Sequence, residues 1–183
     1  MRTERFGNSL FFLTLLFFLW GGITSLNDIL IPHLKGLFLL NYRQAMMIQF
    51  CFFTAYLLVS FPASRLIAKV GYQRSMVYGL LLMTVGCLLF IPSAWFISFP
   101  LFLSAFFILA SGITILQVAA NPYVTLLGDP NTASSRLNLT QAFNSLGTFL
   151  APMMGAALIL SNQQETGSNS IIAPYLGLAA FIF

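Results

Sequence analysis

Long apolar runs, separated by short polar connections, constrain this chain more than any other feature. A helix needs about 20 mostly apolar residues to cross the hydrocarbon core of a bilayer. Five runs come close to that length or exceed it, and a sixth stops after ten residues; they cover residues 8–31, 45–67, 75–91, 96–127, 137–160 and 174–183. We therefore expect an all-α, polytopic transmembrane bundle of six helices, the sixth truncated, within a longer protein.

Composition supports a membrane protein and excludes several other classes. Charged residues make up 7% of the chain and hydrophobic residues 58%, whereas about 25% of a soluble domain is charged. Too few charges remain to cover a soluble enzyme, and the chain is too apolar for a disordered segment. Cys51 and Cys87 lie inside apolar runs and are interpreted as small buried side chains rather than as a disulfide.

The cations lie at the ends of the apolar runs, as membrane anchors do, and not in a stripe that would bind nucleic acid. With the N-terminus in the cytoplasm, six of the eight fall on the inner side, namely Arg2, Arg5, Arg65, Lys69, Arg74 and Arg136. Lys35 and Arg43 fall outside. This asymmetry predicts a multi-pass protein of the cytoplasmic membrane. The first run has the charge and length of a signal peptide but no clear cleavage site after it, so we expect it to be retained.

Polar residues inside the runs indicate where a ligand binds, because they are costly in a bilayer. Asp28 is the only acid within the runs. At about 100° per residue, it shares one arc of the first helix with Trp20 and Asn27. The alternative interpretation is that Asp28 lies at the outer helix end and is simply hydrated.

Amide side chains mark the fourth and fifth runs in the same way. Gln117 and Asn121 share a face in the fourth, and Gln141 and Asn144 share one in the fifth. Each amide offers both a donor and an acceptor, which suits the hydroxyl groups of a neutral polyol better than an ion. For Gln117 and Asn121, hydrogen bonding between helices with no ligand remains the alternative, whereas Gln141 and Asn144 are expected to line a water-filled cavity. A ridge of small residues, Gly147, Ala151 and Gly155, predicts close helix packing on the fifth run.

Three segments carry a resemblance to a known family: WGGITSLNDILIP (20–32), SGITILQVAANPYVTLLG (111–128) and RLNLTQAFNSLG (136–147). Together they resemble the fucose–galactose–glucose:proton symporter family of the major facilitator superfamily, and the likeness runs across nearly the whole chain. A trace of the superfamily's loop between helices two and three appears at residues 69–74, but Ala68 stands where the usual acid is expected. Fucose permeases carry a Glu where this sequence has Gln117, so the resemblance is to the glucose/galactose branch.

The resemblance implies the N-terminal half of a twelve-helix transporter that works by alternating access. It implies a proton-coupling role for Asp28 and sugar contacts from Trp20, Asn27, Gln117, Gln141 and Asn144. The implied partners are a hexose, a coupling proton (or sodium), the lipid bilayer and the missing C-terminal six-helix half. Half of such a transporter has one wall of the cavity, so we expect no transport from residues 1–183 alone.

Two other functions stay open at this point. Another facilitator-type porter, such as a drug:proton antiporter, would carry apolar cations and would not depend on Gln141 or Asn144. A membrane sugar sensor would bind hexose without moving it. The sequence has one histidine, His33, and no metal or phosphate-binding motif, so we expect no enzyme, no catalytic residue, no metal and no cofactor.

Overall fold

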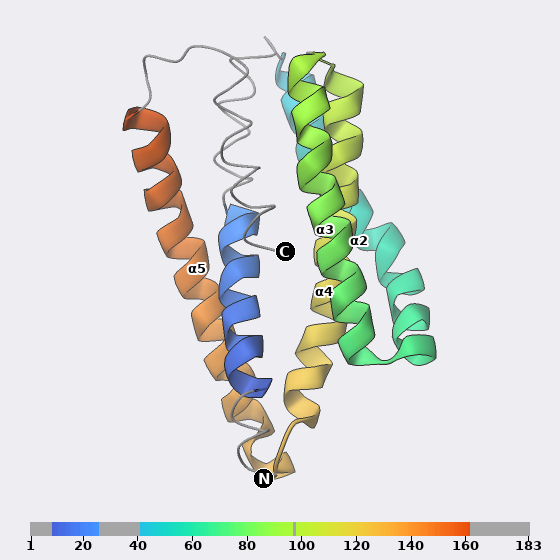
Figure 1. The fold of residues 1–183 in the computed structure, drawn as a ribbon, viewed down its shortest axis with the longest axis vertical. Coiled ribbons are helices and arrows are strands. Elements are labelled where there is room, and N and C mark those ends of the chain that lie inside the picture. Colours follow the sequence, from blue (N-terminus) through green and yellow to red (C-terminus); the bar gives the residue numbers. More distant parts are fainter. Residues whose placement is uncertain (1–8, 26–40, 97, 162–183) are drawn as a thin grey trace. The chain divides into compact units, whose positions relative to one another are not determined.

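The computed structural model describes residues 9–25, 41–96 and 98–161, and all the regular structure in these ranges is helical, which confirms the all-α prediction (Figure 1). The order is helix Ser9–Ser25, α2 (Tyr42–Val70), α3 (Tyr72–Trp95), α4 (Phe99–Leu126), the 3₁₀ helix η1 (Pro130–Thr132) and α5 (Ala133–Ser161). The predicted run 174–183 and the last part of run 8–31 lie outside the described residues.

Three of these helices are long and apolar enough to cross a membrane: Tyr42–Val70, Tyr72–Ser93 and Phe99–Leu126. The helix Ser9–Ser25 is shorter over its described length, and α5 begins with several polar turns. α2 starts three residues before its predicted run. There the Asn41 side-chain oxygen accepts a hydrogen bond from the Gln44 backbone N–H, and the Gln44 side-chain oxygen accepts one from the Asn41 backbone N–H. Such a capping box satisfies free amides at a helix start, and hydropathy alone does not reveal it.

Glycine makes the two sharp turns possible. Gly71, with φ 84°, is the single residue between α2 and α3. Gly128, with φ 72°, follows the end of α4. Residues with a side chain rarely adopt such positive φ values, so glycine is the natural helix terminator at both places.

The chain divides into two compact units. The first unit contains residues 1–29 and 120–157, and the second unit contains residues 30–119 and 158–183. α4 contributes its last two turns to the first unit and the rest of its length to the second.

Helices of the second unit pack backbone to backbone through glycine. A Cβ on Gly86 of α3 would lie 2.7 Å from the Leu109 nitrogen of α4, and one on Gly112 would lie 2.7 Å from the Gly79 oxygen. Aromatic rings pack beside this contact: the Phe90 and Phe102 centroids are 5.0 Å apart, and the pair Phe52–Phe106 links α2 to α4 at 5.6 Å.

The first unit uses the same device between helix Ser9–Ser25 and α5. A Cβ on Gly21 would overlap the Asn144 carbonyl oxygen, and one on Gly147 would overlap that of Phe18. A Cβ on Gly22 would meet that of Ala151 at 3.5 Å. Close packing by Gly147 and Ala151 is thus confirmed. Contacts advance along both helices together, so the two helices run in the same direction (Figure 1).

Candidate functional site

Two amide side chains meet between the end of α4 and the start of α5. Gln141 Nε2 donates a hydrogen bond of 3.3 Å to Asn121 Oδ1, and both side chains are half-buried. This bond uses one donor of Gln141 and one lone pair of Asn121, so the paired amides retain donors and acceptors for other groups. The structure therefore brings together amides from the fourth and fifth predicted runs.

Asn144 binds the backbone of the first helix. Its Nδ2 donates to the Phe17 carbonyl oxygen at 2.9 Å. One turn further along α5, the Thr148 hydroxyl donates to the Asn144 carbonyl at 3.0 Å and lies 3.4 Å from that of Gly21. At least one donor of Asn144 thus serves helix packing, and its role toward sugar stays a prediction.

A proline in α5 creates a further bond between these helices. Pro152 has no N–H, so the carbonyl of Thr148, four residues earlier, lacks its usual helical donor. The Ser25 hydroxyl donates to that carbonyl at 2.9 Å. Such replacement donors are how prolines are tolerated in membrane helices.

Trp20, the predicted aromatic cover for a sugar ring, is buried within the first unit. Its side chain is 7% exposed, and its ring lies edge-on to that of Phe17 with centroids 5.3 Å apart. In the described structure this indole packs in the core, and its contact with sugar stays a prediction.

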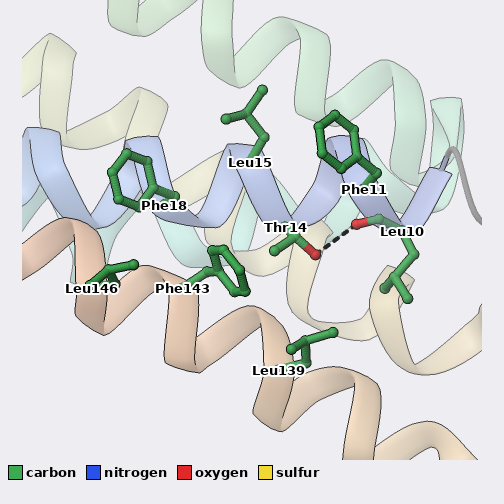
Figure 2. Close-up of a pocket in the computed structure, with 8 residues that line it drawn as sticks. All are labelled: Leu10, Phe11, Thr14, Leu15, Phe18, Leu139, Phe143 and Leu146. Carbon is green, nitrogen blue, oxygen red and sulfur yellow. Dashed lines mark hydrogen bonds between the residues drawn. The ribbon is translucent and has the colours of Figure 1, made fainter.

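An open groove lies on the same pair of helices, further toward their N-terminal ends (Figure 2). It has a volume of about 640 Å³ and is lined by Leu10, Phe11, Thr14, Leu15, Phe18, Leu139, Phe143 and Leu146. The hydroxyl of Thr14, its one polar side chain, donates to the Leu10 carbonyl at 2.8 Å. With that donor engaged, the groove suits apolar groups and does not suit a hexose.

A buried arginine, Arg136, closes the turn between α4 and α5. Its guanidinium donates to the carbonyl oxygens of Val124 (3.3 Å), Thr125 (3.1 Å) and Asp129 (2.9 Å), and to the Thr132 hydroxyl. The last carbonyls of a helix lack helical donors and carry partial negative charge. Hydrogen bonds to a charged group contribute about 1.5–3 kcal/mol each, so these contacts outweigh the unfavourable placement of a cation near the start of α5.

Sequence reasoning assigned Arg136 only to the membrane flank and missed this role. A signal is present in the sequence, because an arginine in the first turns of one helix follows a short turn that ends the previous helix. A cation is disfavoured at a helix N-terminus, and that conflict points to a partner nearby.

Of the other predicted site residues, one lies on α4, one turn before Asn121, and two lie outside the described residues. Gln117 is half-buried on the part of α4 that belongs to the second unit. Asn27 and Asp28 fall outside the described residues. Within the described part of the chain, no three His, Cys, Asp or Glu side chains gather into a metal site.

Known proteins resemble this chain in both sequence and fold. It is 59% identical over 180 residues to a glucose/galactose transporter of Brucella abortus, covering 96% of this chain and 44% of that protein. It is 44% identical over 147 residues to the L-fucose-proton symporter of Escherichia coli, covering 80% of this chain and 34% of that protein.

The crystal structure of the Escherichia coli fucose:proton symporter FucP matches with a TM-score of 0.83 at 34% identity, covering 97% of this chain and 47% of that one. The chain thus spans less than half the length of these relatives. The model of the Major Facilitator Superfamily matches residues 10–183. This chain, with its apolar membrane-length helices, therefore belongs to the major facilitator superfamily.

Proposed function

We propose that this chain is the N-terminal half of a transporter that takes up a hexose such as glucose or galactose, coupled to a cation, with the proton preferred over sodium. The observation that carries the proposal is the half-buried Asn121–Gln141 amide pair between two helices of 28 and 29 residues. Such amides can bind sugar hydroxyls through both donors and acceptors. The names of the similar proteins, a glucose/galactose transporter and a fucose-proton symporter, agree with this chemistry.

In the proposed cycle, Asp28 takes up a proton from outside, which removes a charge that is costly to bury. Hexose then binds to Gln141, Asn144, Gln117 and Asn27, with Trp20 against the ring. The loaded, neutral site turns inward by rocking of one half against the other. A membrane potential drives each transferred proton with about 2.3 kcal/mol per 100 mV.

The proposed location is the cytoplasmic membrane, with the N-terminus inside. The six cations assigned to the inner side, against two outside, support this orientation. The helix Ser9–Ser25 and α5 run parallel, so Ser9 and Arg136 lie toward the same end of the first unit, which is consistent with this assignment.

Counterflow of labelled glucose, galactose and L-fucose tests this function in proteoliposomes that contain the complete protein, with and without a pH gradient. We expect glucose or galactose to accumulate when the outside is acidic. Asp28→Asn should keep sugar exchange but lose accumulation, because the amide of asparagine cannot take up and release a proton. Asp129→Asn is the matched control, since this exposed acid caps η1 and asparagine caps equally well.

Three results would contradict the proposal. Equal loss of exchange and accumulation in Asp28→Asn would remove the coupling role. Transport of apolar cations without hexose would indicate a drug antiporter, and hexose binding without flux would indicate a sensor. Gln117→Glu probes the sugar preference: unchanged selectivity and pH profile would place Gln117 away from the ligand.

A further inference from the structure

Arg136 stands out among the described residues because its side chain is charged and only 5% exposed. Its acceptors span three segments: Val124 and Thr125 in the last turn of α4, Asp129 in the turn, and Thr132 in η1. Each donor of the guanidinium points in a fixed direction, because the group is planar and rigid. Together these bonds fix how the start of α5 sits on the end of α4.

The Asn121–Gln141 pair lies directly beyond these contacts on the same two helices. Asn121 precedes Val124 by three residues on α4, and Gln141 follows Arg136 by five on α5. α4 leads into the turn and α5 leads out of it, so residues further back on α4 face residues further along α5. The Arg136 contacts and the Asn121–Gln141 bond therefore depend on the same alignment of the two helices along their axes. A slip of one residue moves a helix by about 1.5 Å along its axis, which would break the 3.3 Å bond between the amides.

We propose that Arg136 is a positioning residue, which holds α4 and α5 in the register that keeps Asn121 and Gln141 together. The fork shape of the side chain, and not its charge alone, does this. Lysine keeps the positive charge that membrane topology requires, but its single ammonium group cannot reach the same spread of acceptors. Arg136→Lys therefore separates positioning from topology.

The first test measures register directly and needs no sugar. Asn121→Cys and Gln141→Cys are introduced together into the complete protein, with its native cysteines replaced, and a short thiol-specific cross-linker is applied in membranes. Adding Arg136→Lys should slow cross-linking about tenfold, the effect of losing one charge-assisted hydrogen bond. The matched control is Arg43→Lys, since Arg43 is an exposed cation in the first turn of α2; it should leave the rate unchanged.

The second test measures hexose affinity in protein that retains Asn121 and Gln141, and this arm rests on the proposed function. Arg136→Lys should weaken glucose or galactose binding about tenfold, while Arg43→Lys should not. A purely structural role would lower the unfolding temperature but leave the cross-linking rate and affinity of the folded protein intact. That result would overturn the proposal.

Two further outcomes also bear on the proposal. If Arg136→Lys does not fold, Thr132→Val replaces it: this variant removes one acceptor, and an unchanged cross-linking rate would overturn the proposal. If the unaltered protein binds no hexose, the proposed function fails, yet slower cross-linking in Arg136→Lys still supports positioning.

Discussion

The two units of the chain differ in the side-chain hydrogen bonds that join their helices. In the second unit, the hydroxyls of Thr84, Ser111 and Thr114 each donate to the carbonyl four residues earlier in their own helix. Hydroxyls of the first unit also bond within a helix, as Thr14 does to Leu10, but Ser25 and Asn144 donate across helices to the carbonyls of Thr148 and Phe17. The second unit has a weak bond between helices, from the Cys51 thiol to the Leu103 carbonyl at 3.5 Å. Both units share close helix approach at glycine.

This difference suggests a division of labour. A hydroxyl bonded within its own helix stays satisfied when that helix moves as a body. A bond between helices breaks or changes when the helices shift, and in lipid no water replaces the lost partner. The hydroxyl bonds of Thr84, Ser111 and Thr114 therefore suit a scaffold, whereas the bonds that Ser25 and Asn144 make between helices respond to helix movement.

The largest expected effect tests what the units share. Gly147→Ala places a methyl group on the Phe18 carbonyl oxygen, and a backbone atom cannot rotate away. We expect a loss of about 3 kcal/mol or more, the upper end for overpacking, read as a lower unfolding temperature of the complete protein in detergent. Gly86→Ala in the second unit should lower the unfolding temperature by a similar amount, since its Cβ would lie 2.7 Å from the Leu109 nitrogen.

Gly22→Ala is the matched control for Gly147→Ala. Its new Cβ would lie 3.5 Å from that of Ala151, an ordinary contact. Alanine is also favoured over glycine within a helix by about 0.5–1 kcal/mol. Equal destabilisation by Gly22→Ala and Gly147→Ala would show that backbone contact does not hold the first unit together.

The next effect belongs to the apolar core of the second unit. Phe102 is 1% exposed, and its ring lies 5.0 Å from that of Phe90 and 6.2 Å from that of Phe106. Phe102→Ala should lower the free energy of unfolding by roughly 2–3 kcal/mol. The loss is smaller than in a soluble core, because lipid still solvates the Phe102 ring when the helices of the unaltered protein separate. Phe53→Ala, at a ring that is 60% exposed, should cost much less in the same unfolding assay. Similar losses would mean that Phe102 is not part of a packed core.

Helices and close packing were predictable from the sequence because both follow local rules. Run length gives the helices, and small residues on one face give the ridge at Gly147 and Ala151. Neighbours were less predictable, because a helical wheel gives the arc on which a residue lies but not what faces it. The wheel indicated that Asn144 and Trp20 belong to the polar arcs of their helices. It did not indicate that Asn144 binds the Phe17 carbonyl or that Trp20 packs on the Phe17 ring.

A smaller effect tests whether the bonds of the first unit depend on proline. Ser25→Ala should cost about 1 kcal/mol, because the Thr148 carbonyl then has neither a hydroxyl nor a helical donor. In a Pro152→Ala background, the residue 152 amide supplies that donor, so the same change should cost roughly 0.6 kcal/mol less. Unfolding temperatures of the unaltered protein, the two single variants and the double variant give this coupling in one double-mutant cycle. Identical costs in both backgrounds would show that Ser25 does not compensate for the proline.

The smallest effect sharpens the comparison between the units. Thr114 is buried in the second unit, and its hydroxyl donates to the Ala110 carbonyl at 2.8 Å within α4. Valine has nearly the same shape, and the Ala110 carbonyl keeps its helical donor, so Thr114→Val should change stability by less than about 0.5 kcal/mol. The measurement is the unfolding temperature beside that of Ser25→Ala. If Thr114→Val costs as much as Ser25→Ala, bonds within a helix matter as much as bonds between helices, and the division between scaffold and responsive unit loses its physical basis.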